Sequence, residues 1–235
     1  MSLRRIRKLF ESGNVMISGV KGSGKDMLMG NIIVRRKLPY VSNVNYGGKY
    51  IPLDFNDIDC GGNTYRNFIE GTVKRYVCPY PEKADVYISD AGIYLPAQFC
   101  KELNKEYPYL ATYAALSRQI NSSSLHTNCQ AAERVYDKLR EQSENYLRCN
   151  KCFVILGFVI QIVTSYDQYD AFVKRVPPFK LTRSLLSGER KYDYEKELLH
   201  YEISYGKIRR YFLFYRNKST YDTRRFKELL ENGID

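Results

Sequence analysis

The amino-acid sequence predicts an α/β fold in which helices flank a mainly parallel central sheet. Short apolar runs alternate with helical segments up to about residue 145, and this alternation is typical of parallel sheets. A glycine-rich loop, residues 19–24, lies between the first apolar run and the first amphipathic segment. Farther along, residues 146–163 have the pattern of a β-hairpin, so we expect a hairpin-containing C-terminal extension.

The N-terminal part of the chain supplies the alternating elements. It opens with a basic segment containing Arg4, Arg5, Arg7 and Lys8, which we interpret as a surface arm. The apolar runs predict strands at 14–18, 40–44, 85–90 and 124–130. Helical spacing predicts helices at 25–36, 64–77, 101–120 and 132–142.

The pattern changes near residue 145. We therefore assign residues 1–144 to a core that contains the glycine-rich loop and residues 145–235 to an extension that completes the same domain. In this extension, residues 166–173 are expected to prolong the hairpin, and 184–205 is a polar, poorly periodic stretch that we interpret as a mobile insertion. A last strand is predicted at 211–214 and a last helix at 224–231.

Composition narrows the class of protein. The chain has 235 residues, of which 44% are hydrophobic and 27% charged, as expected for one packed domain. Its net charge of +11 indicates an anionic partner: nucleic acid, nucleotide or an acidic membrane face. Only Cys149 and Cys152 form a CxxC pair, and two histidines do not complete a zinc site.

No segment of the sequence has the character of a membrane anchor. The most apolar run, residues 153–160, is much shorter than the roughly 20 residues that a spanning helix needs. The first residues contain no apolar signal region. We therefore expect a cytoplasmic protein with no transmembrane helix of its own.

The glycine-rich loop carries the clearest chemical signal. Residues 19–26, GVKGSGKD, match the pattern G-x-x-x-x-G-K at Gly19, Gly24 and Lys25. Backbone N–H groups of such a loop surround phosphates, the lysine reaches the β- and γ-phosphates, and the following helix adds the positive end of its dipole. We predict a binding site for ATP and Mg²⁺ whose loop residues are Gly19, Val20, Lys21, Gly22, Ser23, Gly24, Lys25, Asp26 and Met27.

One loop position departs from the usual pattern. Asp26 stands where a Ser or Thr hydroxyl ordinarily binds Mg²⁺. Magnesium accepts carboxylate oxygens, so Asp26 is a candidate metal ligand, directly or through water. The alternative is that its negative charge repels the phosphates and weakens nucleotide binding.

A second acid ends the apolar strand at 85–90. Asp90 would lie beside the phosphate loop, because α/β proteins bind ligands at the carboxyl ends of their parallel strands. There it would hold Mg²⁺ or orient the attacking water. We therefore name Asp90 as both a metal and a catalytic candidate, beside Asp26 as a metal candidate.

The order of these motifs resembles the zonula occludens toxin (Zot) family. Its members are assembly ATPases of filamentous phages and belong to the FtsK–HerA group of DNA-pumping motors. The resemblance covers about residues 14–225. The matching segments are the loop 19–26, the strand 41–44, the acidic strand end 86–95, residues 116–118, the strand end at Gln130, residues 137–140 and the segment 218–223.

The family's acidic strand end usually reads Asp-Glu-Ala, and two alignments are possible here. Alignment on Ala91 and Gly92 places Ser89 at the magnesium acid and Asp90 at the catalytic glutamate. Alignment on the apolar run makes Asp90 the magnesium acid and Ala91 the glutamate position. The first agrees better with the flanking residues, and in it Asp26 supplies the carboxylate that Ser89 lacks.

The resemblance also implies residues that act around the γ-phosphate. Motors of this group form rings in which an arginine of one subunit reaches the nucleotide of the next, where it stabilises transition-state charge. Arg118 is our first candidate for this arginine and Arg140 the second. Gln130 matches the polar sensor at the end of the neighbouring strand, where its amide would contact phosphate or water.

The resemblance implies an ATP-driven, ring-forming motor that packages or extrudes DNA in phage assembly. Its partners would be DNA, bound without sequence specificity, and other phage assembly proteins at the host membrane; it would lie in the cytoplasm or at the inner face of that membrane. The alternative is a nucleotide-binding switch or scaffold with little or no hydrolysis, motivated by Asp26 and the incomplete acidic pair. A small-molecule kinase fits the loop, but the sequence offers no arginine-rich lid.

Overall fold

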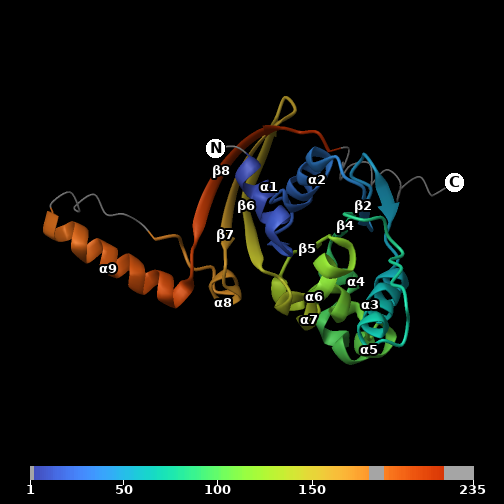
Figure 1. Cartoon of the computed structure of the whole chain (residues 1–235). Coiled ribbons are helices and arrows are strands. Elements are labelled where there is room, and N and C mark those ends of the chain that lie inside the picture. The colour runs from blue at the N-terminus through green and yellow to red at the C-terminus, as the bar shows by residue number, and fades with distance from the viewer. Residues whose placement is uncertain (1–2, 180–187, 220–235) are drawn as a thin grey trace.

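The computed structural model describes residues 3–179 and 188–219 (Figure 1). Its strands are β1 (Val15–Ser18), β2 (Tyr40–Ser42), β3 (Tyr50–Pro52), β4 (Asp85–Ile88), β5 (Leu125–Cys129), β6 (Asn145–Ile155), β7 (Phe158–Tyr166) and β8 (Arg209–Arg216). Its α-helices are α1 (Arg4–Ser12), α2 (Lys25–Arg36), α3 (Phe55–Ile69), α4 (Ala91–Tyr94), α5 (Cys100–Glu106), α6 (Leu110–Asn121), α7 (Asp137–Glu141), α8 (Tyr169–Val173) and α9 (Gly188–Tyr205). Two short 3₁₀ helices are η1 (Ala97–Phe99) and η2 (Ala132–Arg134).

All described strands belong to one sheet, in the order β3-β2-β4-β5-β1-β6-β7-β8. The strands from β3 to β6 are parallel, while β7 pairs antiparallel with β6 and β8 antiparallel with β7. The predicted fold class, a mainly parallel sheet flanked by helices with a C-terminal hairpin, is therefore confirmed.

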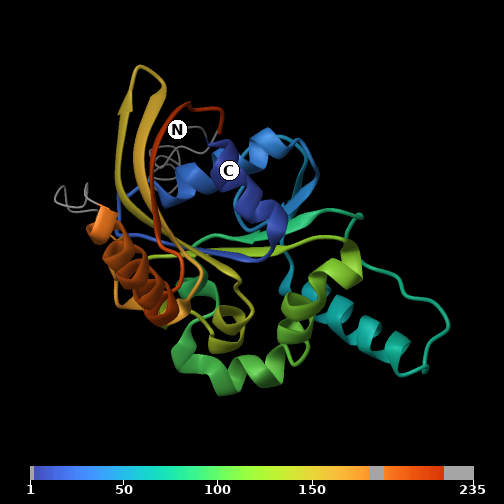
Figure 2. The ribbon, with the colours of Figure 1, turned by 60° about the vertical axis from the view of Figure 1, so that its left-hand side comes forward.

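Helices cover both faces of the sheet (Figures 1 and 2). Helices α1 and α2 pack on one face, where residues such as Phe10, Leu28 and Ile32 form a buried core. Helices α3 and α5–α8 pack on the other, in a core that includes Tyr113 and Phe172. Successive strand residues alternate between these cores, because side chains along a strand point to opposite faces.

The topology brings the predicted site together. Strand β1 lies between β5 and β6, and β4 lies next to β5, all in parallel orientation. Their carboxyl ends therefore meet at one edge of the sheet, where the chain leaves β1 into the glycine loop. Ligands of open α/β sheets bind at this edge.

The basic N-terminal segment is a helix rather than a surface arm. Helix α1 spans Arg4–Ser12 and buries Ile6 and Phe10 completely. These two residues are four apart and lie on one helical face, which packs against the sheet, while the basic residues face outward. The prediction of an arm was wrong because it weighed charge and overlooked this apolar pair.

Three predicted helices have different limits. The helix predicted at 64–77 is α3, which begins earlier, at Phe55, because Asp54 caps it by accepting a hydrogen bond from the Asn56 N–H. The helix predicted at 101–120 is divided into α5 and α6 around Pro108, which disfavours helical geometry in the residue before it. The helix predicted at 132–142 is divided into η2 and α7, where Val135 pairs with Pro96. Strand β3 was not predicted.

The C-terminal extension contains two more corrections. Residues 166–173 do not prolong the hairpin, since 169–173 form helix α8. Residues 188–205 of the predicted mobile insertion form helix α9, which projects from the body (Figure 1). Its Glu, Lys and Leu content favours helix even without a regular apolar stripe. The helix predicted at 224–231 lies outside the described residues, within which no helix is long and apolar enough to cross a membrane.

Candidate functional site

The glycine loop runs from β1 into α2 in the geometry that the motif predicts. Gly22 and Gly24 both have φ of +80°, a conformation that favours glycine. A Cβ at Gly24 would lie 2.6 Å from the Cys152 sulfur, and one at Gly19 would lie 2.9 Å from the Cys149 carbonyl oxygen. Backbone strain and close packing against β6 together explain the glycines at these positions.

The antiparallel hairpin supports this loop from the side. The Gln161 side chain on β7 donates hydrogen bonds to the carbonyl oxygens of Ser23 (3.1 Å) and Gly24 (3.0 Å). Its own oxygen accepts a hydrogen bond of 2.9 Å from the Tyr215 hydroxyl on β8. Gln161 is 1% exposed, and a lone glutamine in an otherwise apolar strand was the only sequence signal for this role.

Lys25 lies between two carboxylates at the start of α2. Its Nζ is 2.8 Å from Asp26 Oδ2 and 3.1 Å from Asp90 Oδ1. Burial opposes the charge on Lys25, but Asp26 and Asp90 outweigh it and hold the pKa of the ammonium above its ordinary value. The structure thus brings together three residues that the sequence nominated from two separate segments.

The second carboxylate oxygen of Asp26 faces the ends of β4 and β5. Asp26 Oδ1 accepts hydrogen bonds from the Ser89 hydroxyl and from the Asn128 amide, each 2.9 Å long. Asn128 also accepts a hydrogen bond from the Asp90 N–H at 2.8 Å. The sequence analysis did not nominate Asn128. The sequence signal was an asparagine near the end of the strand predicted at 124–130, and the structure shows that this residue is fully buried.

Asn43 fixes the backbone on either side of Ser89. Its side chain accepts from the Ser89 N–H at 2.8 Å and donates to the Ser89 carbonyl oxygen at 2.9 Å. The residue after Ser89, Asp90, has φ of +49° and a one-third exposed side chain. Asn43 therefore holds the hydroxyl against Asp26 at the point where the chain turns toward Lys25.

The remaining loop candidates and Gln130 lie at the same edge. Val20 and Lys21 are exposed and Met27 is half-buried. Gln130 follows β5 directly, is exposed, and lines a cavity of about 250 Å³ next to the acidic strand end. The cavity is lined by Asp90, Gly92, Ile93, Gln130, Ala131 and Arg134.

The two arginine candidates lie at the opposite edge of the sheet. Arg118, near the end of α6, hydrogen bonds to the Ser12 carbonyl oxygen and forms a 2.8 Å ion pair with Glu144. Arg140, on α7, donates to the Tyr169 hydroxyl at 2.9 Å and lies over its ring. Both precede strands that run toward the loop, so neither is beside the loop of its own chain.

Other arginines do lie at the loop edge, and the sequence did not nominate them. Arg134 lines the cavity beside Asp90. Arg148 is opposite Ser18 in the sheet register, directly before the loop, and donates 2.9 Å to the Phe172 carbonyl oxygen. Arg148, Arg175 and Arg210 line a second cavity of about 270 Å³ together with Gly19, Val20 and Gln130.

The oxygen ligands at this edge suit a magnesium ion that is shared with phosphates. Mg²⁺ is usually held by one or two carboxylates, with phosphate and water completing its shell. Asp26 and Asp90 supply carboxylates, and both contact Lys25. Ser89 supplies a hydroxyl, which donates to Asp26. Within the described ranges, no cluster of three or more His, Cys, Asp or Glu side chains could hold a metal alone.

The fold and the loop define the class: this chain has the architecture of a P-loop NTPase. No family model and no curated protein sequence matches it. Among solved structures, the N-terminal domain of zonular occludens toxin from Neisseria meningitidis is similar, with a TM-score of 0.43 and 12% identity over 73% of this chain and 95% of that one. This is the family that the sequence motifs resemble.

Two further structures are similar to this chain. The DNA-packaging ATPase B204 from Sulfolobus Turreted Icosahedral Virus has a TM-score of 0.39 and 12% identity over 66% of this chain and 92% of that one. ATPases 2 and 3 of EssC from Geobacillus thermodenitrificans have a TM-score of 0.43 and 14% identity over 74% of this chain and 36% of that one. At these similarities, an assignment of function has to rest on the residues of the site.

Proposed function

We propose that this chain binds ATP with Mg²⁺ at the glycine loop and hydrolyses it to move DNA during the assembly of phage particles. One observation carries the proposal: Lys25 begins a helix directly after a strand and a glycine loop, and it contacts Asp26 and the strand-end acid Asp90. A lysine, backbone amides and carboxylates at a helix N-terminus are the groups that bind and polarise a magnesium-bound triphosphate.

Each group has a proposed role. The loop from Gly19 to Met27 would surround the phosphates. Lys25 would exchange its ion pairs with Asp26 and Asp90 for contacts with the β- and γ-phosphates. Asp26 and Ser89 bind Mg²⁺, which neutralises phosphate charge, while Asp90 orients the attacking water. The 2.9 Å contact between Asp26 and Ser89 supports this alignment, in which the two side chains share the work of the usual hydroxyl and acid. Gln130 contacts the γ-phosphate or the water.

The ring is part of the proposal. Arg118 and Arg140 lie away from the loop of their own chain. Whichever of them serves as the catalytic arginine therefore acts on the nucleotide of a neighbouring subunit. DNA is the proposed cargo because the net charge of +11 suits sequence-independent contacts with phosphates and because the order of motifs resembles the DNA-moving Zot family.

ATP hydrolysis by the purified chain tests the proposal, measured with no DNA, single-stranded DNA and double-stranded DNA. We expect DNA to raise the rate of hydrolysis. Lys25→Ala should reduce this rate by about 10²-fold or more, because the lysine no longer stabilises the negative charge of the transition state. Lys105→Ala, an exposed lysine on α5, is the control and should keep the wild-type rate. A DNA-stimulated rate that survives Lys25→Ala would contradict the proposal.

Asp26 and Asp90 can be separated by comparing binding with turnover. Asp90→Asn should retain Mg²⁺-dependent ATP binding and lose turnover, whereas Asp26→Asn should lose the Mg²⁺ dependence of binding. Calorimetric titration of ATP with and without Mg²⁺ makes the measurement. If Asp90→Asn instead abolishes Mg²⁺-dependent binding, the other alignment is correct and Asp90 is the metal ligand.

The second candidate is a nucleotide-binding switch or scaffold. It is favoured by the ion pairs of Lys25 within its own chain and by Ser89, a hydroxyl where the family has an acid. In this case ATP would bind and order the loop, but no turnover would follow with either DNA. Tight, Lys25-dependent ATP binding without hydrolysis would select it.

A further inference from the structure

The outer side of the antiparallel strands exposes an unusual amount of apolar surface. Strand register places six residues on one face of β6, β7 and β8, each at least 41% exposed. We call them the outer apolar face: Phe153, Ile155, Phe158, Ile160, Phe212 and Phe214. Such a continuous apolar patch marks a surface that meets a protein or a membrane. The inner face of the same strands is buried against α1 and α2, so folding of this chain does not require the outer one.

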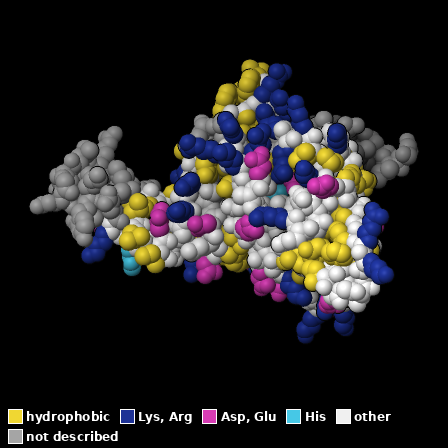
Figure 3. Space-filling model, viewed as in Figure 1, with side chains coloured by type: hydrophobic (Ala, Val, Ile, Leu, Met, Phe, Trp, Pro, Cys, Tyr) yellow, Lys and Arg dark blue, Asp and Glu magenta, His cyan; other side chains and the backbone are white. Residues whose placement is uncertain are grey.

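The hairpin tip extends this surface beyond the body of the protein. Leu156, between β6 and β7, is 94% exposed, and its neighbours Val154 and Ile155 are more than half exposed. Figure 3 shows hydrophobic side chains at the projecting tip, with Lys and Arg side chains gathered beside and below them. The tip is therefore a protrusion that can enter an apolar medium.

The conformation of Leu156 adds an independent argument. Leu156 and Gly157 have φ of +49° and +78° and form a two-residue connection between strands. Such hairpin turns favour Asn-Gly, because a bulky side chain is strained at positive φ. Leu156 lowers the stability of the fold through its strained backbone, and its exposed side chain contributes no burial in return. Strain of this kind is characteristic of a functional position.

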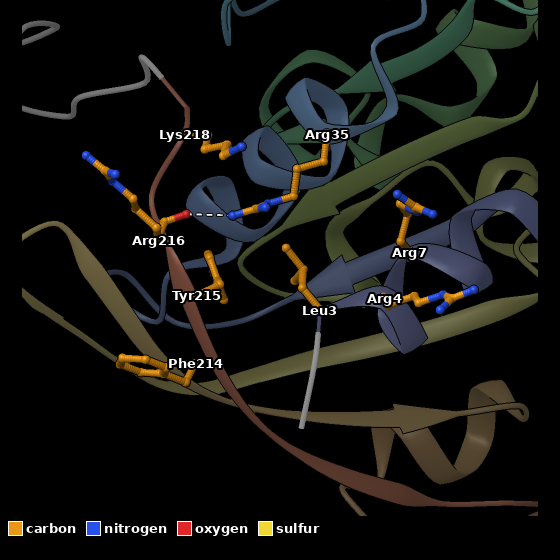
Figure 4. A pocket seen from close by; sticks show the side chains of 8 residues that line it. All are labelled: Leu3, Arg4, Arg7, Arg35, Phe214, Tyr215, Arg216 and Lys218. Carbon is orange, nitrogen blue, oxygen red and sulfur yellow. Dashed lines mark hydrogen bonds between the residues drawn. The ribbon is translucent and has the colours of Figure 1, made fainter.

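A cationic pocket lies at the end of β8 that pairs with the tip, and Figure 4 shows its lining residues. It has a volume of about 450 Å³ and is lined by Leu3, Arg4, Arg7, Arg35, Phe214, Tyr215, Arg216 and Lys218. Arg216 is opposite Phe158 in the strand register, and the Asn217 N–H donates 2.8 Å to the Gly157 carbonyl oxygen at the tip. The end of β8 therefore joins the pocket to the tip.

The charges of the pocket favour an anionic ligand. Five of its lining residues are cationic and none of those described is acidic; Glu11, outside the lining, pairs with Arg7 at 3.1 Å. The Nε atom of Arg35 is buried without a hydrogen-bond partner, so this guanidinium group has a donor to offer. Arg35 lies ten residues along α2 from Lys25, about 15 Å at the helical rise, so this pocket is separate from the glycine loop.

We propose that the hairpin tip inserts into the surface of a lipid bilayer and that the cationic pocket binds the phosphate of an anionic phospholipid. A bilayer accounts for all three observations at once: a protruding aliphatic tip, an adjoining apolar face and a cationic pocket next to them. A second copy of the chain would bring its own net charge of +11 against these cations. Nucleic-acid bases stack on aromatic rings, which the phenylalanines of the outer apolar face offer but the protruding Val154, Ile155 and Leu156 do not, so the aliphatic tip favours lipid.

Flotation of the full chain with lipid vesicles tests this proposal, without ATP or DNA so that the result is independent of the proposed ATPase. The vesicles are phosphatidylcholine alone, and an equimolar mixture of phosphatidylcholine and phosphatidylglycerol. We expect stronger binding to the mixture. Leu156→Asn should weaken binding about tenfold, since it removes a buried leucine from the lipid. Val77→Asn, at an exposed valine far from the tip, should bind like the wild type.

A charge variant separates the pocket from the tip. The double variant Arg4→Gln and Arg216→Gln should weaken binding to the mixture about thirtyfold and leave binding to phosphatidylcholine alone unchanged. Lys101→Gln with Lys105→Gln removes the same charge from exposed positions on α5 and should retain binding. Thermal unfolding shows whether each variant is folded, and Leu156→Asn should unfold no earlier than the wild type because Asn suits the turn.

Each of the following outcomes would overturn the proposal. The first is a wild-type chain that floats with neither vesicle, or a Leu156→Asn variant that floats as well as the wild type. The second is an oligomer in light scattering that Leu156→Asn converts to monomer without any lipid binding, which would make the face an interface between copies. The third is a chain that does not bind vesicles but binds a single-stranded oligonucleotide, with a binding affinity that Leu156→Asn reduces.

Discussion

The two ends of the sheet differ in what their faces meet. The parallel strands β1, β4 and β5 are buried at every position, because helices cover both faces. From Arg210 onward the edge strand β8 alternates between exposed and buried residues, with only its inner face covered. The parallel end thus builds the phosphate site, whereas the antiparallel end supports that site with one face and presents an apolar surface with the other.

The contact between these two regions is concentrated on the glycine loop. Gln161, on the β6–β7 hairpin, donates to the Gly24 carbonyl oxygen, and Cys152 of the same hairpin leaves no room for a Cβ at Gly24. A P-loop usually depends on its own glycines and the helix behind it. Here the C-terminal hairpin is a second support, which explains why a chain that completes its site by residue 130 continues into three more strands.

The largest expected effect is at Gly24. Gly24→Ala would place a methyl group 2.6 Å from the Cys152 sulfur in addition to straining a φ of +80°. We expect the free energy of unfolding to fall by about 3 kcal/mol or more, from strain and overpacking together. Urea denaturation makes the measurement.

Gly22 supplies the matched control for this variant. It has the same φ of +80°, but a Cβ there would meet no atom within 4 Å. Gly22→Ala should therefore cost only the strain, about 1–2 kcal/mol. Equal losses in the two variants would show that the hairpin does not press on the loop.

Gln161→Leu is expected to have the next largest effect. It removes the donor to the buried Ser23 carbonyl oxygen, at about 1–3 kcal/mol, whereas the Gly24 carbonyl oxygen keeps its 2.9 Å hydrogen bond from the Leu28 N–H. Nucleotide affinity should fall with stability, because the loop loses its side support. The exposed Gln168→Leu is the control. If Gln161→Leu binds ATP like the wild type, the hairpin does not position the loop.

Acid should weaken the parallel end of the sheet through His126. Burial lowers the pKa of this fully buried imidazole, although Asp85 opposes the shift. The unfolded chain then takes up a proton near pH 6.5 that the folded chain resists, so stability is complete above this pH and falls below it, by up to about 1.4 kcal/mol per pH unit. Chemical denaturation between pH 7 and pH 5 would show this slope.

His126→Asn should flatten the slope, and His200→Asn, at an exposed position on α9, should preserve it. Asp85 does not contribute to the slope of stability between pH 7 and pH 5. Burial would raise the pKa of its carboxyl, but His126 and Arg36 outweigh this and lower it, so its contribution disappears only in more acidic solution. An unchanged slope in His126→Asn would mean that another group takes up the proton.

The smallest expected effect has the opposite sign. Leu156→Asn should raise the free energy of unfolding by about 0.5–1 kcal/mol, because Asn tolerates the left-handed conformation of a two-residue hairpin better than Leu. Thermal denaturation without lipid makes the comparison. A loss of stability would show that Leu156 packs on something within the chain, and it would remove the argument that the outer apolar face has an external occupant.

Local signals explain which elements could be predicted. The strand–loop–helix unit at β1 and α2 depends on neighbours in sequence, so its pattern was sufficient. The limits of α3, α5, α6 and α7 depended on a cap, a proline and a bridge to a distant residue, and these predictions were displaced or merged. Helix α1 was missed because two buried residues, Ile6 and Phe10, were hidden among cations.

By itself, the sequence determined the fold class, the phosphate loop and the acid at the end of β4, because glycine conformation, helix start and strand alternation are local properties. Only the tertiary structure decided which side chains meet there. It placed Asn128 and Ser89 on Asp26, Gln161 on the loop, and Arg118 and Arg140 at the far edge. Strand order sets these contacts, and it follows from packing between segments that are distant in the sequence, such as β1 and β6. The same packing covers one face of the hairpin and leaves the other apolar and open.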